Sequence, residues 1–393
     1  MEPQVNQELL GAARKIAPTL REHAAEGERQ RRVPKASWDA LRSAGLLRLY
    51  LPKGLGGLEA DPVTVARVVE EVALADTAAA WMLQANVNAW WCARMPEEGV
   101  RAMWGKDPDT VGGAAFFPPV PAVEVPGGVK LTGRRPFASG AHDSPWMMLT
   151  GMIMDNGQPR MVQGHPAIVA AFFPTSQATI HDTWHTLGLR GTDTEDVEVK
   201  DLVVPSHLTF PMAPEFTPNK LYAGSLYRAP AMAAHIGAIM APIALALARN
   251  ALTEVVALAQ TKQPFPATSM LRDRPVAQGR IAEAEATLRA ARALLYGTLQ
   301  ESWDRTRAGK EHTLAQKNEV MLAAVHAMKT CSDAMQSLHT IAGTSGIYTR
   351  NALERHFRDL MTLRQHGLIN ASRYETAGQV LLGLPPDMPF VAF

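Results

Sequence analysis

Cysteine is scarce in this chain of 393 residues, which contains only Cys92 and Cys331. Two cysteines make neither a disulfide framework nor a four-cysteine metal site. The first ten residues carry acid and amide groups and lack the basic and apolar regions of a secretory signal. We therefore expect a protein of the reducing cytoplasm.

The sequence also lacks an excess of charge of one sign and lacks long apolar runs. Lys plus Arg number 39 and Asp plus Glu number 38, so there is no electrostatic signature of nucleic-acid or anionic-membrane binding. The longest apolar run, 236–247, is shorter than the ~18 residues of a transmembrane helix. We expect neither nucleic acid nor membrane as a partner, and a globular protein with two or three domains.

Helical periodicity is present at both ends of the chain and absent from its middle. Up to about residue 104, apolar residues recur at helix spacing, as in the stripe that follows Pro62. In the middle, apolar runs bounded by Gly and Pro predict strands of an antiparallel sheet or barrel, at 123–125, 129–131, 147–152, 168–173 and 197–204. The last part predicts a bundle of four long helices, at 236–258, 276–307, 314–341 and 353–382.

These sequence patterns predict a mainly α fold with a central β domain. The expected parts are an α-helical domain in residues 1–108, a β-barrel or β-sandwich in 109–218 and a four-helix bundle in 219–393. An order of domains does not by itself define a function.

Three stretches resemble the acyl-CoA dehydrogenase superfamily. They are GGVKLTGRRPFASGAHDSPW (127–146), TWHTLGLRGTDTEDVEVKDLVVP (183–205) and LERHFRDLMTLRQHG…YETAGQVLLG (353–383), which contains an R-D…H pattern. The first and third are most similar to its two-component flavin-dependent monooxygenase branch (group D, hydroxylase component), where GG…L-x-G-x-W-x-F-x-S-G is typical. The resemblance spans nearly the whole chain and implies the acyl-CoA dehydrogenase-like fold and a flavin cofactor.

The chain departs from the family pattern at three places. Arg135 or Pro136 stands where the phrase has tryptophan, Ala141-His142-Asp143 replaces D-H-A, and Thr194 replaces a common serine. Because these changes alter the shape of the pocket, the resemblance alone does not assign the substrate of a relative to this chain.

One position separates the two chemistries of the superfamily. An acyl-CoA dehydrogenase needs a carboxylate base beside the flavin to take the α-proton of a thioester. Counting from Arg358-Asp359 with the family spacing leads to Gly367, preceded by His366, and the second family location of the base falls on Tyr227. None of these residues is a carboxylate.

Glu375, in a Y-E-T phrase that mimics the family's Y-E-G, lies too far along the chain from Asp359 to be that base. If it were the base nevertheless, the chain would be an acyl-CoA dehydrogenase that desaturates a CoA thioester with FAD. A third alternative is a scaffold of this fold without a working flavin site.

The leading hypothesis is a monooxygenase that uses reduced flavin, FADH2 or FMNH2, and O2. The resemblance implies a C4a-hydroperoxyflavin that oxidises an aromatic or heteroaromatic small molecule. His366 is the first predicted catalytic residue, because a neutral imidazole can deprotonate a phenol or hold the peroxide. Ser139 is the second, because relatives use a hydroxyl there to reach the N5/O4 edge of the flavin; its alternative is an ordinary Ser-Gly turn.

The remaining predicted flavin contacts rest on the resemblance. Those near the ring are Phe137, Ser139, Trp184, Arg190 and Thr192. Those for the adenine-diphosphate half, which the family binds between subunits, are Arg274, Gln278, Gln336, Gly343 and Gly346. Core packing by Trp184, turn anchoring by Arg190 and helix capping by the glutamines and glycines remain as alternatives.

The predicted substrate pocket consists of Trp81, Trp90 and His142. The tryptophans belong to an aromatic-rich stretch of the first domain that would suit a flat substrate, with core filling as the alternative. His181 and His185 have the spacing of a metal pair on a helix, but their segment is predicted as strand and turn, so we predict no metal site.

No G-x-G-x-x-G follows a predicted strand, so a Rossmann nicotinamide site is not indicated. Reducing equivalents would then come from a separate NAD(P)H-dependent flavin reductase. That partner and the homotetramer typical of the family are expectations from the resemblance.

Overall fold

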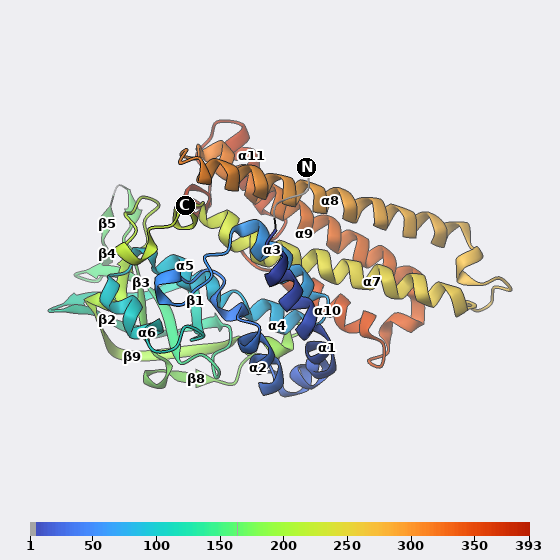
Figure 1. Ribbon diagram of the computed structural model, residues 1–393, viewed down its shortest axis with the longest axis horizontal. Coiled ribbons are helices and arrows are strands. Elements are labelled where there is room, and N and C mark those ends of the chain that lie inside the picture. The colour runs from blue at the N-terminus through green and yellow to red at the C-terminus, as the bar shows by residue number, and fades with distance from the viewer. Residues whose placement is uncertain (1–4, 163) are drawn as a thin grey trace.

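Helices dominate the first quarter of the chain in the computed structural model, which describes residues 5–162 and 164–393 (Figure 1). Asp61 caps one helix by accepting from the backbone N–H groups of Val63 and Thr64, with Pro62 at the first helical position, as predicted. Asp76 caps the next helix by accepting from Ala78. The helices are α1 (Gln7–Gln30), α2 (Lys35–Ser43), α3 (Pro62–Ala73), α4 (Thr77–Met82), α5 (Ala85–Trp91) and α6 (Glu97–Trp104).

The middle of the chain forms a mixed sheet. Within the described residues its strands follow the order β10-β7-β3-β1-β2-β9-β8, with β4 paired to β3, and β5 and β6 form a separate pair. The strands are β1 (Gly112–Val125), β2 (Gly128–Ala138), β3 (Trp146–Asp155), β4 (Gln158–Pro159), β5 (Met161–Val162), β6 (His165–Pro166), β7 (Ile168–Pro174), β8 (Thr179–His181), β9 (Glu195–Pro205) and β10 (Thr209–Pro211). All five predicted runs lie in strands of this sheet.

The expectation of a purely antiparallel sheet is wrong for one pair. Strand β2 turns back along one edge of β1. The segment 139–145 then carries the chain across to the other edge, where β3 runs parallel to β1. Ser139 lies at the start of this crossing, so the crossing sets the position of a predicted site residue.

The last part of the chain is a helical bundle. A π-helix, η9 (Ala233–Met240), leads into α7 (Ala241–Thr261), followed by α8 (Pro275–Arg307), α9 (Leu314–Ala342), α10 (Ala352–Leu363) and α11 (Arg373–Leu381). Together Ala233–Thr261 is long and apolar enough to cross a membrane, but its most apolar window is 83% buried inside the protein. That burial is what a core helix of a globular protein shows.

The fourth long helix was predicted as continuous, and this prediction is wrong. The chain leaves the helix after Leu363 and re-enters at Arg373. In between, the Asn370 side chain accepts from the N–H and the hydroxyl of Ser372, a local bond that competes with helix formation. His366 therefore lies in a turn and not on a helix.

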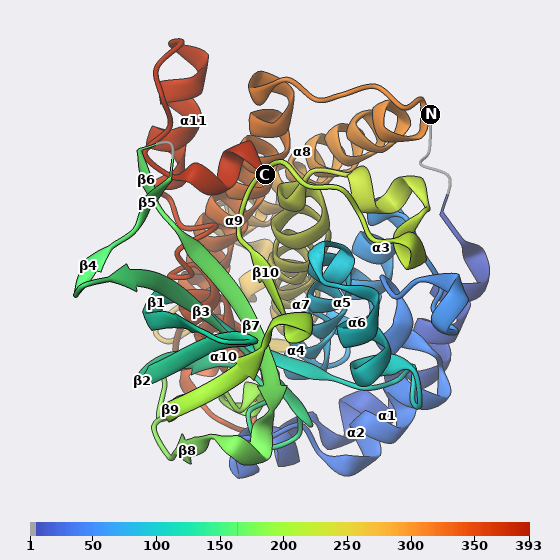
Figure 2. The same ribbon diagram turned by 90° about the vertical axis from the view of Figure 1, so that its left-hand side faces the viewer.

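The three parts pack around one contiguous hydrophobic core. The sheet and the N-terminal helices lie side by side in front of the bundle, with α4 and α5 between them (Figure 2). Cys92 and Cys331 are both free and buried. The boundaries 1–108, 109–218 and 219–393 stay a prediction.

Asp76 gives the helix cap of α4 a measurable pH signature. Burial raises the pKa of its carboxyl from 3.8 to about 6, and its Oδ2 atom is enclosed without a partner among the described residues. The folded carboxyl thus holds its proton to a higher pH than the unfolded one. The free energy of folding that this bound proton contributes is fully present below pH ~4 and is lost as the pH rises to ~6.

We expect Asp76→Asn to raise the free energy of unfolding at pH 8 by about 1–3 kcal/mol, since the amide still caps the helix but carries no charge. Urea unfolding at pH 4.5 and pH 8 measures the effect, with Asp61→Asn, the cap of α3, as the control. An Asp76→Asn protein whose stability varies with pH as the wild type does would contradict this account.

Candidate active site

Three predicted residues from distant parts of the sequence meet at the centre of the molecule. The indole N–H of Trp81 on α4 donates to Ser139 Oγ at 2.9 Å. On its other side the Trp81 ring lies edge-on to His366, with 5.7 Å between ring centroids. Trp81 thus links the end of β2 to the turn between α10 and α11.

Ser139 is the first hydroxyl of a buried chain of hydrogen bonds. Its Oγ is 2.8 Å from Thr194 Oγ1, which is 2.7 Å from Thr192 Oγ1. Thr192 in turn donates to the carbonyl oxygen of Leu189 at 2.8 Å.

The two ends of this chain determine the direction of every proton in it. An indole N–H only donates and a carbonyl oxygen only accepts. Because Thr192 gives its proton to Leu189, its contact with Thr194 requires Thr194 to donate, and Ser139 must then donate to Thr194. Ser139 accepts from Trp81 with one lone pair, so one further lone pair is left to accept a hydrogen bond from a ligand.

Phe137 presents an exposed aromatic ring two residues before Ser139. Its φ of +69° is in the left-handed region, which costs a non-glycine residue about 1–2 kcal/mol. The side chain is 61% exposed and lies edge-on to Trp184 at 6.4 Å. Residues in such strained backbone conformations cluster at active sites and ligand-binding sites.

Trp184 is anchored at both its backbone and its ring. Its backbone N–H donates to Glu195 Oε2 at 2.7 Å and its indole N–H donates to the carbonyl of Leu189 at 2.8 Å. The carbonyl oxygen of Leu189 therefore accepts two hydrogen bonds, one from the indole of Trp184 and one from Thr192 at the end of the hydroxyl chain.

The R-D pair of the sequence pattern holds this loop in place. Asp359 Oδ1 accepts from the backbone N–H of Leu189 at 2.7 Å, and Arg358 Nη1 donates to the carbonyl of Leu187 at 2.9 Å. Burial raises the pKa of Asp359. Arg190 donates to the carbonyl of Thr186 at 2.8 Å, so it anchors its own turn. The clamping role of Arg358 and Asp359 was not foreseen from the sequence.

Gly188 allows the closest approach between this loop and α10. A Cβ atom there would lie 2.2 Å from the backbone oxygen of Arg358, so one of the two segments would have to move. We expect Gly188→Ala to lower the free energy of unfolding by about 1–3 kcal/mol and to disturb the Leu189 end of the hydroxyl chain.

The matched control is Gly297→Ala in α8, where a Cβ meets nothing within 4 Å and helix propensity predicts a gain of about 0.5–1 kcal/mol. Urea denaturation of both variants tests the pair. Equal stability of the two variants would show that the contact between Gly188 and α10 is not tight.

His366 is a neutral donor at physiological pH. Burial lowers its pKa to about 4. Its Nδ1 accepts from the backbone N–H of Leu368 at 3.3 Å, which assigns the ring proton to Nε2. His366 thus offers an N–H group to the space beside Trp81.

No described acidic side chain hydrogen-bonds to Ser139, Trp81 or His366. Glu375 lies on the exposed side of α11, and the hydroxyl of Tyr227 donates to the carbonyl of Tyr50 at 3.2 Å. Neither residue supplies the carboxylate that thioester desaturation needs beside the flavin.

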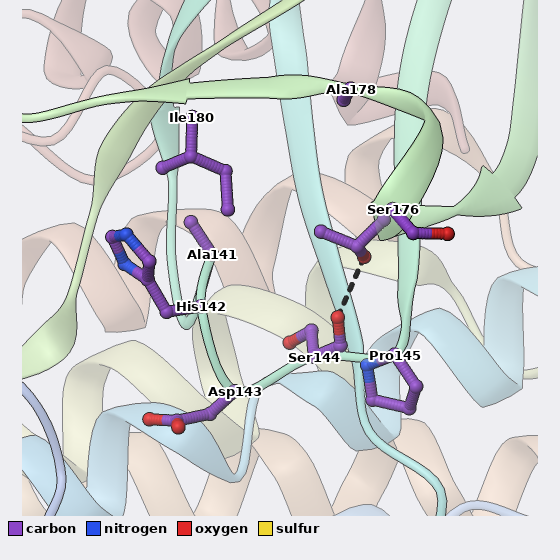
Figure 3. Close-up of a pocket in the computed structure, with 9 residues that line it drawn as sticks. Ala141, His142, Asp143, Ser144, Pro145, Ser176, Ala178 and Ile180 are labelled. Atoms are coloured by element: carbon purple, nitrogen blue, oxygen red, sulfur yellow. Dashed lines mark hydrogen bonds between the residues drawn. The ribbon is translucent and has the colours of Figure 1, made fainter.

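Two predicted pocket residues lie elsewhere. Trp90 is in the core, where its indole N–H donates to the carbonyl of Leu226 at 3.2 Å. His142 bonds to Asp193 at 2.7 Å and lines a surface pocket of about 640 Å³ (Figure 3). Neither Ser139, Trp81 nor His366 contributes to that pocket, whose lining is Ala141, His142, Asp143, Ser144, Pro145, Thr175, Ser176, Ala178 and Ile180.

The start of α8 and the end of α9, near which the predicted contacts to the adenine-diphosphate half lie in sequence, are at the end of the bundle away from the sheet (Figure 1). Lys262 Nζ, just after the end of α7, joins this helix to the end of α9 by donating to Ala342 O at 2.5 Å and to Ser345 Oγ at 2.8 Å. Phe265, 99% exposed, lies in the loop between α7 and α8. The predicted residues at this end are Arg274, Gln278, Gln336, Gly343 and Gly346.

Gln278, Gln336 and Gly343 also have local roles. Gln278 donates to Arg272 O at 2.9 Å and Gln336 to Ser332 O at 3.3 Å. Gly343 ends α9 with a φ of +54°, and a Cβ at Gly346 would lie 3.0 Å from the ring of His339. The capping alternative therefore holds for Gly343, and flavin contact by these residues stays a prediction.

His181 and His185 pair with separate carboxylates, Glu198 at 2.7 Å and Asp182 at 3.2 Å. Sequence reasoning missed Thr194 as the link between Ser139 and Thr192, although the two threonines alternate as residues on one face of a strand do. It also missed His235, the only histidine in residues 229–248, which is buried and whose pKa His366 influences.

Two family models match the chain. "Acyl-CoA dehydrogenase, N-terminal domain" matches residues 5–105, and "Acyl-CoA dehydrogenase, C-terminal domain" matches residues 238–371.

Named relatives align over nearly the whole chain. The indole-3-acetate monooxygenase of Pseudomonas putida is 31% identical over 93% of this chain and 92% of its own length. The oxygenase component of an FADH2-dependent resorcinol hydroxylase from a Rhizobium species is 28% identical, over 96% and 95%. The crystal structure of the HsaA monooxygenase from M. tuberculosis superposes with a TM-score of 0.89 at 26% identity, covering 98% of this chain and 100% of that one.

Proposed function

Since the chain belongs to the acyl-CoA dehydrogenase family, within its flavin-dependent monooxygenase branch, we propose that it is the oxygenase component of a two-component system. It would use reduced flavin and O2 to hydroxylate or otherwise oxidise a small aromatic or heteroaromatic molecule. The observation that carries the proposal is the directed hydroxyl chain at Ser139, next to a neutral His366 and without an acid bonded to either residue among those described.

The residues around Ser139 suit a reduced flavin. The exposed ring of Phe137 and the anchored ring of Trp184 offer apolar surface to a planar tricycle. The remaining lone pair of Ser139 can accept from a ring N–H, which reduced flavin carries at N5. When bound, the reduced flavin supplies the electrons with which O2 is activated.

In this proposal His366 donates a hydrogen bond to the oxygen that reacts. Its Nε2–H can donate to an oxygen atom that gains negative charge in the space that Trp81 borders. Deprotonating a substrate through Nε2 would first require loss of the proton that Nε2 carries. The bond from Leu368 to Nδ1 therefore favours the donor role over that of a general base.

The reductant, the assembly and the location follow from the family and remain proposals. The FADH2-dependent relative is named as an oxygenase component, which supports a separate NAD(P)H-dependent flavin reductase as the partner. The exposed Phe265, Val276 and Ile347 near the predicted adenine-diphosphate contacts support burial against another subunit in a homotetramer. Two free, buried cysteines are compatible with the cytoplasm.

The proposal is tested by adding anaerobically reduced FAD or FMN to the protein with indole-3-acetate or resorcinol and then admitting ¹⁸O2. We expect a product that carries one ¹⁸O atom, seen by mass spectrometry, and none when NADH and oxidised flavin replace the reduced flavin. Bleaching of a tightly bound FAD by an acyl-CoA, with no oxygenated product from any aromatic compound, would instead establish thioester desaturation.

A further inference from the structure

His235 is a buried histidine that takes no part in the hydroxyl chain or in the role proposed for His366. It lies in η9, an eight-residue π-helix, and π-helical turns are concentrated at functional sites because they widen the helix and redirect side chains. The π-helix is closely packed at Gly237, where a Cβ would lie 2.9 Å from Leu299 and 3.1 Å from Val320.

The surroundings of His235 are aromatic and belong to the candidate active site. Its ring is 6.0 Å from that of Phe116 on β1. The π-helix packs against α4, which carries Trp81, and Trp81 contacts His366. Burial, together with the charge that a protonated His366 would carry, lowers the pKa of His235 to about 3.

The ring nitrogens of His235 have no hydrogen-bond partner among the described residues. The side chain is only 6% exposed, yet its nitrogens are not among the fully enclosed polar atoms without a partner, unlike Nδ1 of His356. These nitrogens are therefore not fully enclosed and remain accessible to a molecule the size of water. A buried polar group that is left without a partner is unfavourable, so a ligand is the expected partner.

We propose that His235 binds the N–H or O–H group of the aromatic substrate and so selects substrates that carry such a donor. The imidazole accepts the substrate's hydrogen bond, while Phe116 supplies apolar contact to the ring and His366 lies on the Trp81 side. Because neither imidazole is charged, this site favours a neutral polar substituent. The inference rests on the proposed function and adds a specificity-determining residue to it.

Binding to the flavin-free protein tests this proposal apart from catalysis. The probes are indole, which carries an N–H, and benzothiophene, which has a similar shape and no donor; calorimetry measures both dissociation constants. We expect the wild type to bind indole more tightly and His235→Phe to lose about tenfold in indole affinity, with less than a twofold change for benzothiophene. His235→Asn, whose amide oxygen accepts a hydrogen bond, should recover most of the preference.

Thermal melting of each variant verifies that it is folded. If His235→Phe does not fold, the indole affinity of His235→Asn and the preference of the wild type for indole over benzothiophene test the proposal instead. Equal affinity of the wild type for both probes, or no saturable binding of either, would overturn the proposal. The ¹⁸O2 experiment fails or succeeds independently of this result, so the two proposals are distinguishable.

Discussion

Replacing His366 with alanine is expected to slow formation of oxygenated product by about 10²- to 10³-fold, the usual effect of removing one well-placed donor to a reacting oxygen. The imidazole is neutral, donates through Nε2 and packs against Trp81. Binding of reduced flavin should change little, because the predicted ring contacts come from the β domain. Single-turnover reactions with reduced flavin, O2 and indole-3-acetate measure the rate.

Two further variants separate a donor from a base. His366→Asn keeps an N–H group and should recover part of the rate, whereas a general base would not be rescued by an amide. His181→Ala removes a histidine of β8 that bonds to Glu198 and should react as the wild type does. A His366→Ala protein with unchanged rate and coupling would remove the residue from the mechanism.

Replacing Ser139 with alanine is expected to divert reduced flavin from product to H2O2. The change removes the acceptor of the Trp81 indole and the lone pair that remains free for a flavin N–H. A buried hydrogen bond left unmade costs about 1–3 kcal/mol, so the ratio of product to H2O2 should fall by about tenfold or more. Peroxide assays and product chromatography on the same samples give this ratio.

Thr194→Val tests the direction of the hydroxyl chain. The substitution keeps the shape of the side chain but removes the acceptor of Ser139's proton, so Ser139 can turn that proton toward the ligand. Coupling should decrease less than in Ser139→Ala. Thr209→Val, which removes a β10 hydroxyl that donates to the backbone carbonyl of Ser206, is the surface control. Unchanged coupling in both Ser139→Ala and Thr194→Val would show that the chain does not act on the flavin.

Several features of the candidate site were predictable because they are local in sequence. The phrase around Phe137 and Ser139 and the position of His366 follow from motifs and spacing. The meeting of Ser139 with Trp81 was not predictable, because these residues are joined only by the packing of α4 against the end of β2. The break between α10 and α11 was also missed. The bond from Ser372 to Asn370 competes with helix formation, but an Asn and a Ser two residues apart are only a weak sequence signal for the end of a helix.

The amino-acid sequence by itself determined the order of helical, strand and bundle segments and the absence of a carboxylate at the family position before Gly367, because periodicity and spacing are properties of neighbouring residues. The tertiary structure decided the rest. It set the proton direction at Ser139, the clamp of Arg358 and Asp359 on the loop at Leu189, and the burial that keeps His366 and His235 neutral. Hydrogen-bond direction and desolvation depend on partners far apart in the chain, and only folding brings those partners together.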